Sequence, residues 1–175
     1  MKRLILWVPL AVFVAFLVTV GVGLYAPSDR KIQSQMVGKP VPAFSLPPML
    51  PDRPGLDSAE YATGEPRIVN VFASWCVPCI AEAPQLEAIA EEGIPIDAVA
   101  VRDRPQDVAE FLRRWGDPYA RIGSDANSQV QIALGASGVP ETFIVDGEGV
   151  IRYYHFGPIN PPDVPDIIAA YEALK

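Results

Sequence analysis

The chain has 175 residues, half of them apolar, and its formal net charge is −7. This length suffices for one domain of ordinary size with a short appendage, and the apolar content suffices for a core. The acidic balance argues against nucleic acid as a partner, because a surface that binds nucleic acid is normally basic.

Residues 1–26 are predicted to form a membrane anchor. Met1-Lys2-Arg3 is followed by a run from Leu4 to Ala26 that carries no charge, long enough to cross a bilayer about 30 Å thick as a helix. A cleaved signal peptide is the alternative, but its apolar region is usually about 7–15 residues long and ends in a small-x-small site. An uncleaved signal-anchor is therefore favoured. Lys2 and Arg3 would stay in the cytoplasm, and the remaining chain would lie outside it.

Residues 27–35 are predicted to be a linker, and residues 36–175 to form one domain. Residues 36–64 are rich in proline and have little periodicity, so we expect an irregular segment with one short extended piece near Ala43–Leu46. The predicted strands are 67–73, 94–101, 119–122, 142–145 and 150–156, and the predicted helices are 77–92, 105–115, 128–134 and 163–174. This order predicts an α/β fold with a mixed sheet covered by helices, in which residues 67–73 form a central strand.

Cys76 and Cys79 are the only cysteines, and they stand at C-x-x-C spacing between a predicted strand and a predicted helix. The unpaired N–H groups and partial positive charge of a helix start stabilise a thiolate. A purely structural disulfide is a poor explanation, because closing so short a loop removes little entropy from the unfolded chain. A zinc half-site would need two further ligands, and the chain has one histidine and no third cysteine. The pair therefore indicates a dithiol–disulfide oxidoreductase without a metal or any cofactor beyond its redox-active disulfide.

Three motifs together resemble the thioredoxin fold, over about residues 36–175. They are Trp75-Cys76-Val77-Pro78-Cys79, Pro84, and Gly138-Val139-Pro140. The resemblance implies that the Val139–Pro140 bond is cis and that Pro140 faces the disulfide; an X-Pro bond adopts cis at a cost of only about 0.5–1 kcal/mol. The Val139 backbone would then be available to pair with an extended substrate segment. Trp75 would form a contact surface beside the disulfide.

Four longer segments are similar to the thiol:disulfide interchange proteins of cytochrome c maturation, the DsbE/CcmG type. They are Gly38–Phe44, Val69–Trp75, Gly138–Asp146 and Gly149–Gly157. The resemblance implies an inner-membrane protein with one N-terminal anchor and a periplasmic catalytic domain. It also implies a reductant of the cysteines of apocytochrome c, or of a partner thiol protein, that receives electrons from a membrane-bound thiol reductant. Residues 105–122 match the central insertion of this group.

The resemblance gives the two cysteines different roles. Cys76 is expected to be the exposed nucleophile, and Cys79 the thiol that resolves the mixed disulfide. Ordinary thioredoxins carry a buried aspartate six residues before the first cysteine, where this chain has Asn70, which cannot titrate. Two acids could replace it: Glu82, about one helical turn beyond Cys79, and Glu141, which follows the proline of the cis bond. The resemblance places both near the active site, although a solvated position on the helix is the alternative for Glu82.

Two other functions stay open at this point. A general extracytoplasmic oxidant or isomerase would carry the same motif, because Val77-Pro78 between the cysteines does not fix the direction of electron flow. A copper carrier of thioredoxin fold would need a suitably placed histidine. The single histidine, His155, is expected at the surface or at a sheet end.

Overall fold

The computed structural model describes residues 2–25 and 34–175 and divides the chain into two units, Met1–Ile32 and Gln33–Lys175. Most of the predicted linker, residues 27–35, lies outside the described residues, as do Met1 and Ala26 at the ends of the predicted anchor. The predicted domain boundaries therefore stay predictions.

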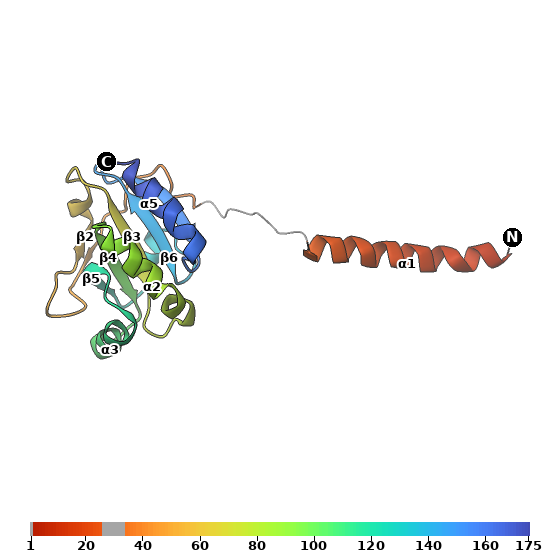
Figure 1. The fold of residues 1–175 in the computed structure, drawn as a ribbon, viewed down its shortest axis with the longest axis horizontal. Helices are drawn as coiled ribbons and strands as arrows, with labels where there is room; N and C mark the ends of the chain where they lie inside the picture. Colours follow the sequence, from red (N-terminus) through yellow and green to blue (C-terminus); the bar gives the residue numbers. More distant parts are fainter. Residues whose placement is uncertain (1, 26–33) are drawn as a thin grey trace. The chain divides into compact units, whose positions relative to one another are not determined.

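The first unit contains one long helix, α1, from Lys2 to Tyr25, with Pro9 inside it (Figure 1). Its described side chains include several large apolar groups that are exposed, among them Trp7, Phe13 and Phe16. Among the residues that the structure describes, no helix combines the length and the apolar content that crossing a membrane requires.

A five-stranded mixed sheet forms the centre of the second unit, in the order β5-β4-β3-β6-β7. The strands are β3 (Arg67–Phe72), β4 (Ile96–Val101), β5 (Tyr119–Asp125), β6 (Glu141–Val145) and β7 (Ile151–Phe156). β3 pairs parallel with β4 and antiparallel with β6, β4 pairs parallel with β5, and β6 pairs antiparallel with β7. The predicted α/β fold, with its mixed sheet and its central strand β3, is confirmed (Figure 1).

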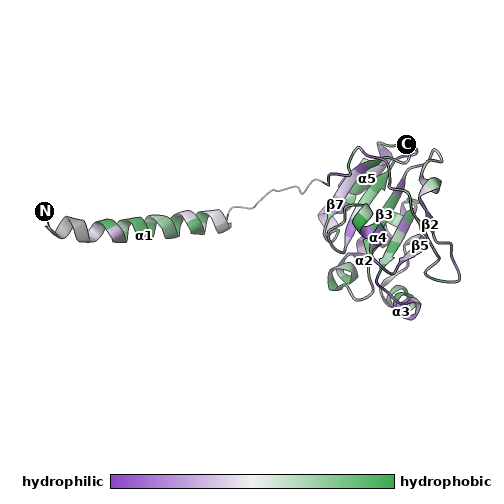
Figure 2. Cartoon of the chain, turned by 180° about the vertical axis from the view of Figure 1, so that it is seen from behind, coloured by the Kyte–Doolittle hydropathy of each residue, from purple (hydrophilic) through white to green (hydrophobic). Residues whose placement is uncertain are grey.

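Helices cover both faces of this sheet, and each face has its own core. Within residues 34–175 the α-helices are α2 (Val77–Glu91), α3 (Pro105–Trp115), α4 (Gln129–Ala133) and α5 (Val164–Glu172), and a 3-10 turn, η2 (Pro161–Asp163), precedes α5. Successive residues of a strand point to opposite faces. Phe72 accordingly packs with Leu86 of α2 and Phe111 of α3, whereas Val71 packs in the second core with Val130 of α4. Figure 2 shows strongly hydrophobic colour on the central strands between these layers.

The proline-rich segment, residues 36–64, packs against the sheet edge formed by β5. It contains a two-stranded antiparallel pair, β1 (Ser45–Leu46) with β2 (Leu56–Asp57), and a 3-10 helix, η1 (Ser58–Tyr61). The Met49 N–H donates to the Ile122 carbonyl, and the Ser124 N–H donates to the Pro47 carbonyl, both at 2.9 Å. These bonds occupy polar groups that an open edge strand would leave unpaired. The predicted extended piece, Ala43–Leu46, contains the shorter β1, but β2 and η1 were not predicted, because each is too short to show a periodicity.

Strand β5 continues to Asp125 and does not end at Ile122 as predicted. Gly123 and Ser124 interrupt the apolar pattern on which the prediction depended. In the structure Gly123 lies against Leu46, and a Cβ at position 123 would be 2.8 Å from the Leu46 Cβ. The glycine is therefore the contact point between β5 and the proline-rich segment, and the strand continues through it.

Gly55 gives a test of how closely the proline-rich segment packs on itself. A Cβ at this position would overlap the Leu46 carbonyl oxygen and would lie 2.7 Å from the Pro47 carbonyl carbon. Because backbone must shift to relieve this overlap, we expect Gly55→Ala to lower the free energy of unfolding by about 1–3 kcal/mol, measured by chemical denaturation. Gly138→Ala is the matched control, since a Cβ there meets no atom within 4 Å. Equal losses in both variants would contradict this account.

Candidate active site

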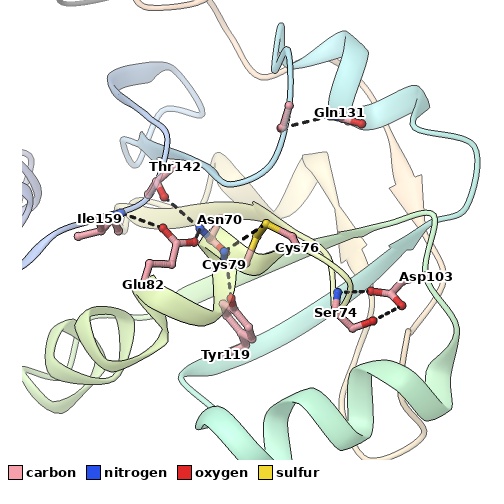
Figure 3. The surroundings of a disulfide bond; sticks show 11 residues. Asn70, Ser74, Cys76, Cys79, Glu82, Asp103, Tyr119, Gln131, Thr142 and Ile159 are labelled. Carbon is pink, nitrogen blue, oxygen red and sulfur yellow. Dashed lines mark hydrogen bonds between the residues drawn. A yellow bond between two sulfur atoms is a disulfide. The ribbon is translucent and has the colours of Figure 1, made fainter.

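Cys76 and Cys79 form a disulfide where the chain passes from β3 into α2 (Figure 3). Cys76 is the N-cap residue of α2, and its Sγ accepts a hydrogen bond from the Cys79 N–H at 3.2 Å. Pro78 lies in the first turn of the helix, where a missing N–H leaves no hydrogen bond unmade. The sulfur of Cys76 thus lies over the unpaired donors of a helix start, an environment that stabilises a thiolate.

The disulfide itself is buried, and its exposed neighbours are apolar. In this oxidised state Cys76 is 4% exposed and Cys79 is 2% exposed. The prediction of an exposed Cys76 is therefore wrong for the disulfide form, because the sulfur turns back over the helix end and does not point outward. Trp75 and Val77, on either side of Cys76, are 59% and 74% exposed. A partner approaching the disulfide meets these two side chains first.

The Val139–Pro140 peptide bond is cis, as predicted. Pro140 is buried, and Val139 is half-buried against the core that contains both cysteines. The Gly138 carbonyl, one residue earlier, accepts a hydrogen bond from the Gln131 side chain of α4 at 3.2 Å (Figure 3). Helix α4 therefore holds the loop that places Val139 against the hydrophobic core containing the disulfide.

Asn70 is the centre of a buried hydrogen-bond network close to the disulfide (Figure 3). Its Nδ2 donates to Glu82 Oε1 at 3.1 Å and to Thr142 Oγ1 at 3.0 Å, and its Oδ1 accepts from the Tyr119 hydroxyl at 2.9 Å. Burial raises the pKa of Tyr119 well above its usual value, so its hydroxyl stays a donor. Tyr119 and Thr142 were not predicted as site residues, because they lie 49 and 72 positions from Asn70 and nothing in their local sequence sets them apart.

Glu82 points into this network and is fully buried, which excludes a solvated position on the helix. Besides the bond from Asn70, its Oε2 accepts a hydrogen bond from the Ile159 N–H at 3.0 Å. Burial raises the pKa of Glu82 to about 7, against the opposing effect of these two hydrogen bonds. A carboxyl group that titrates near neutrality, one helical turn from Cys79, is suited to exchanging a proton with that thiol.

Glu141 lies in a different environment, on the other face of the sheet. Its Oε1 accepts hydrogen bonds from the Ser137 N–H at 2.8 Å, the Ser137 hydroxyl at 2.9 Å and the Gly138 N–H at 2.9 Å, and its Oε2 accepts from the Tyr154 hydroxyl at 2.8 Å. Thr142, the next residue of β6, bonds to Asn70, so strand alternation directs Glu141 away from Glu82. The structure therefore does not bring the two predicted acids together. Glu141 holds the turn that leads into the cis bond.

A second carboxylate beside the redox motif was not predicted. Asp103, in the loop after β4, accepts hydrogen bonds from both the N–H and the hydroxyl of Ser74 (Figure 3). The two residues are 29 positions apart. Because parallel strands end at the same sheet edge, residues just beyond β3 and β4 could have been paired from the predicted topology.

Within residues 2–25 and 34–175, no group of three or more histidine, cysteine, aspartate or glutamate side chains is placed to hold a metal ion. His155 is a residue of β7, and its side chain is mostly covered, with Nε2 at 3.3 Å from the Pro158 carbonyl oxygen.

Comparisons with known proteins agree with this geometry. The redoxin family model matches residues 36–171. Thiol:disulfide interchange protein DsbE of Pseudomonas fluorescens biotype C is 38% identical over 175 residues, covering 99% of this chain and 97% of the relative. The protein of the same name from Escherichia coli K12 is 36% identical over 167 residues, covering 92% of this chain and 89% of the relative. A crystal structure from Chlorobium tepidum, assigned to the DsbE thiol:disulfide interchange proteins, superposes with a TM-score of 0.68 at 23% identity and covers 79% of this chain and 96% of that chain.

The raised pKa of Glu82 predicts a specific pH dependence of stability. The pKa is about 7 in the folded protein and near 4.5 for an ordinary glutamate, so the folded state binds the proton more tightly. The stabilisation is complete below pH 4.5 and is lost as the pH rises through 7. At about 1.4 kcal/mol per pKa unit, the loss is on the order of 3 kcal/mol.

We therefore expect the wild type to lose unfolding free energy relative to Glu82→Gln when the pH is raised from 4 to 8. Denaturant titrations of the oxidised proteins at both pH values measure this difference. Any constant offset reflects the altered hydrogen bonds to Asn70 and Ile159 and is not the test. A difference that does not change with pH would show that Glu82 titrates as an ordinary glutamate.

Proposed function

The chain belongs to the redoxin family and is a thiol:disulfide interchange oxidoreductase of the DsbE type, and we propose that it reduces disulfides of apocytochrome c, or of a partner thiol protein, during cytochrome c biogenesis. The observation that carries the proposal is the Cys76–Cys79 pair at the start of α2, with the buried carboxyl group of Glu82 one helical turn beyond it.

In the proposed reaction, the reduced protein begins with Cys76 as the thiolate, stabilised by the N-terminus of α2. The Cys76 sulfur attacks one sulfur of the partner disulfide, and the other partner sulfur leaves as a thiolate. A mixed disulfide then joins the two proteins. Trp75 and Val77 offer an exposed apolar contact for this partner, and the Val139 backbone offers a pairing site for an extended segment.

The second half of the proposed reaction needs Cys79 as a thiolate in a buried position. Glu82 takes the proton of the Cys79 thiol, since its raised pKa makes it a stronger base than a solvated glutamate. The Cys79 thiolate attacks the Cys76 sulfur, the partner leaves with both cysteines reduced, and the protein regains its disulfide. Two electrons pass to the partner in each cycle, so a reductant must open the disulfide of the protein again, and we propose that a membrane-bound thiol reductant does so.

The proposed client is supported by the four segments that resemble the cytochrome c maturation proteins, which include the strand leading up to the redox motif and both flanks of the cis bond. We further propose that the N-terminal segment anchors the protein in the inner membrane, with the redox domain in the periplasm. The support is the charge-free run Leu4–Ala26 and the exposed apolar side chains of α1. The described helices do not by themselves qualify as a span, so this part of the proposal rests on the sequence.

The client is tested by trapping the mixed disulfide. We expect Cys79→Ser, expressed in the native host, to accumulate a covalent complex with apocytochrome c or with its assembly factors, because the second thiol is needed to release the partner. Non-reducing electrophoresis and mass spectrometry of the complexes identify what is bound. The double variant Cys76→Ser with Cys79→Ser is the control and must trap nothing.

The identity of the trapped proteins decides between functions. A spread of unrelated secreted proteins would indicate a general disulfide oxidant or isomerase and would overturn the assignment to cytochrome c biogenesis. Because the double variant has no cysteine, complexes that persist in it would not be mixed disulfides of this protein and would contradict the trapping through Cys76.

The anchor is tested by fractionation and by protease access. We expect the full chain to stay in the membrane pellet after an alkaline carbonate wash, and its redox domain to be digested in spheroplasts but not in intact cells. Replacing Leu17 and Val18 with arginine should release the protein from the pellet, because a charged residue near the centre of a span costs about 2.5–3.5 kcal/mol. A shorter, soluble wild-type product would instead show that the segment is cleaved.

A further inference from the structure

Ser74 and Asp103 join two loops beside the redox motif by hydrogen bonds, and the proposed reaction gives this contact no role. β3 and β4 are parallel neighbours, with Phe72 opposite Ala100. Their carboxyl ends therefore meet at one edge of the sheet, where Ser74 follows β3 and Asp103 follows β4. Figure 3 shows the two side chains facing each other, on the far side of the disulfide from Glu82.

The contact is short and uses both oxygens of the carboxylate. Asp103 Oδ2 accepts the Ser74 N–H at 2.5 Å, and Oδ1 accepts the Ser74 hydroxyl at 2.7 Å. Oδ1 also accepts the Arg104 N–H at 3.0 Å. Hydrogen bonds to an ionised acceptor are about twice as strong as neutral ones and fix the geometry of their donors.

The loop that carries Asp103 adopts an uncommon backbone conformation. Arg102, the residue before Asp103, has φ of 49°, in the left-handed region that non-glycine residues rarely adopt. Its N–H donates to the Asp125 carbonyl at 3.1 Å. Such conformations persist where the surroundings hold them and are frequent at functional sites. Here the conformation places the Asp103 carboxylate against Ser74.

Ser74, on the other side of the contact, lies in the turn that also contains Trp75. The Cys76 N–H donates to the Ala73 carbonyl at 3.2 Å and closes a turn with Ser74 and Trp75 at its two central positions. Trp75 is largely exposed, so its direction depends on the turn more than on packing. Fixing the main chain at Ser74 fixes the direction in which Trp75 leaves the surface.

We propose that Asp103 is a positioning residue that holds the Ser74–Trp75 turn and thereby orients Trp75 for docking of a protein or peptide disulfide. The inference rests on the proposed function. Asp103 acts through Trp75 on partner binding, and not on the reactivity of the Cys76 sulfur. Its loss should therefore affect a peptide disulfide, which contacts Trp75, more than a small disulfide, which does not need that contact.

The test compares two substrates for the full-length, pre-reduced protein: an oxidised peptide with a C-x-x-C-H disulfide and hydroxyethyl disulfide. Rates come from acid quench and thiol alkylation, so no tryptophan signal is needed. We expect Asp103→Ala to lower kcat/KM for the peptide about tenfold, equal to about 1.4 kcal/mol, mainly through KM. The rate with hydroxyethyl disulfide should change less than about twofold.

A double-mutant cycle with Trp75 separates positioning from a general structural effect. Adding Asp103→Ala to Trp75→Ala should cause no more than about a twofold further loss with the peptide, because the residue through which Asp103 acts is already absent. Additive losses, or equal losses with both substrates in the single variant, would overturn the proposal.

Two further variants control for folding and for charge. Asp103→Asn keeps an oxygen for the Ser74 N–H, and the Ser74 hydroxyl can reverse its role, but the NH2 group of the asparagine cannot accept the Arg104 N–H, so this variant should recover part of the peptide activity. Activity as low as that of Asp103→Ala would overturn the positioning role in favour of a role for the charge. Asp107→Ala removes the same charge four residues along, where the carboxylate binds Arg104, and should leave both rates unchanged. If the wild type fails to reduce the peptide, the proposed function fails as well; if it succeeds and Asp103→Ala matches it, only this inference fails.

Discussion

The buried amide of Asn70 is the contact on which the arrangement of the site depends. Both of its Nδ2 hydrogens are used, one for Glu82 and one for Thr142, while its oxygen accepts from Tyr119. Three elements, α2, β6 and β5, are therefore tied to the central strand at one point. An aspartate at this position could not donate to Glu82, and two carboxylates would repel each other in a buried site. Asn70 and Glu82 therefore belong together: the strand β3 supplies a neutral donor, and the helix α2 supplies the titrating group.

Three carboxyl groups near the redox site, those of Glu82, Glu141 and Asp103, have different roles in the structure. Glu82 accepts two hydrogen bonds and has a raised pKa because it is buried. Glu141 accepts four hydrogen bonds, three of them from the turn that leads into the cis bond. Asp103 accepts three and lies at the edge of the site. The number and origin of the donors, more than proximity to the cysteines, separate an acid that can exchange a proton from acids that hold backbone in place.

Much of this could be predicted from the sequence, and the failures have physical causes. The α-helices of the redox domain begin and end within two residues of their predicted bounds, and the pattern is clearest for α3, in which charged and apolar residues alternate with helical spacing. The cis bond followed from the resemblance carried by a short motif. β2 and η1 were missed because each is too short to show a periodicity. The burial of Cys76 was missed because it depends on the direction of its side chain, which points back over the start of α2 in the disulfide form. Glu82 was identified, but its environment depends on Ile159, 77 positions away, which no local pattern reveals.

That distance has a consequence for the order in which the molecule becomes functional. The redox cysteines and Glu82 lie within seven residues of one another. The Ile159 N–H that donates to the Glu82 carboxylate comes much later in the sequence, just before η2 and α5. A chain still emerging during synthesis has its thiols long before this donor is in place. The burial that raises the pKa of Glu82 is complete only after this last segment has packed against α2. In the proposed mechanism, in which Glu82 takes the Cys79 proton, a partly made chain would therefore carry both cysteines without the buried acid that serves them.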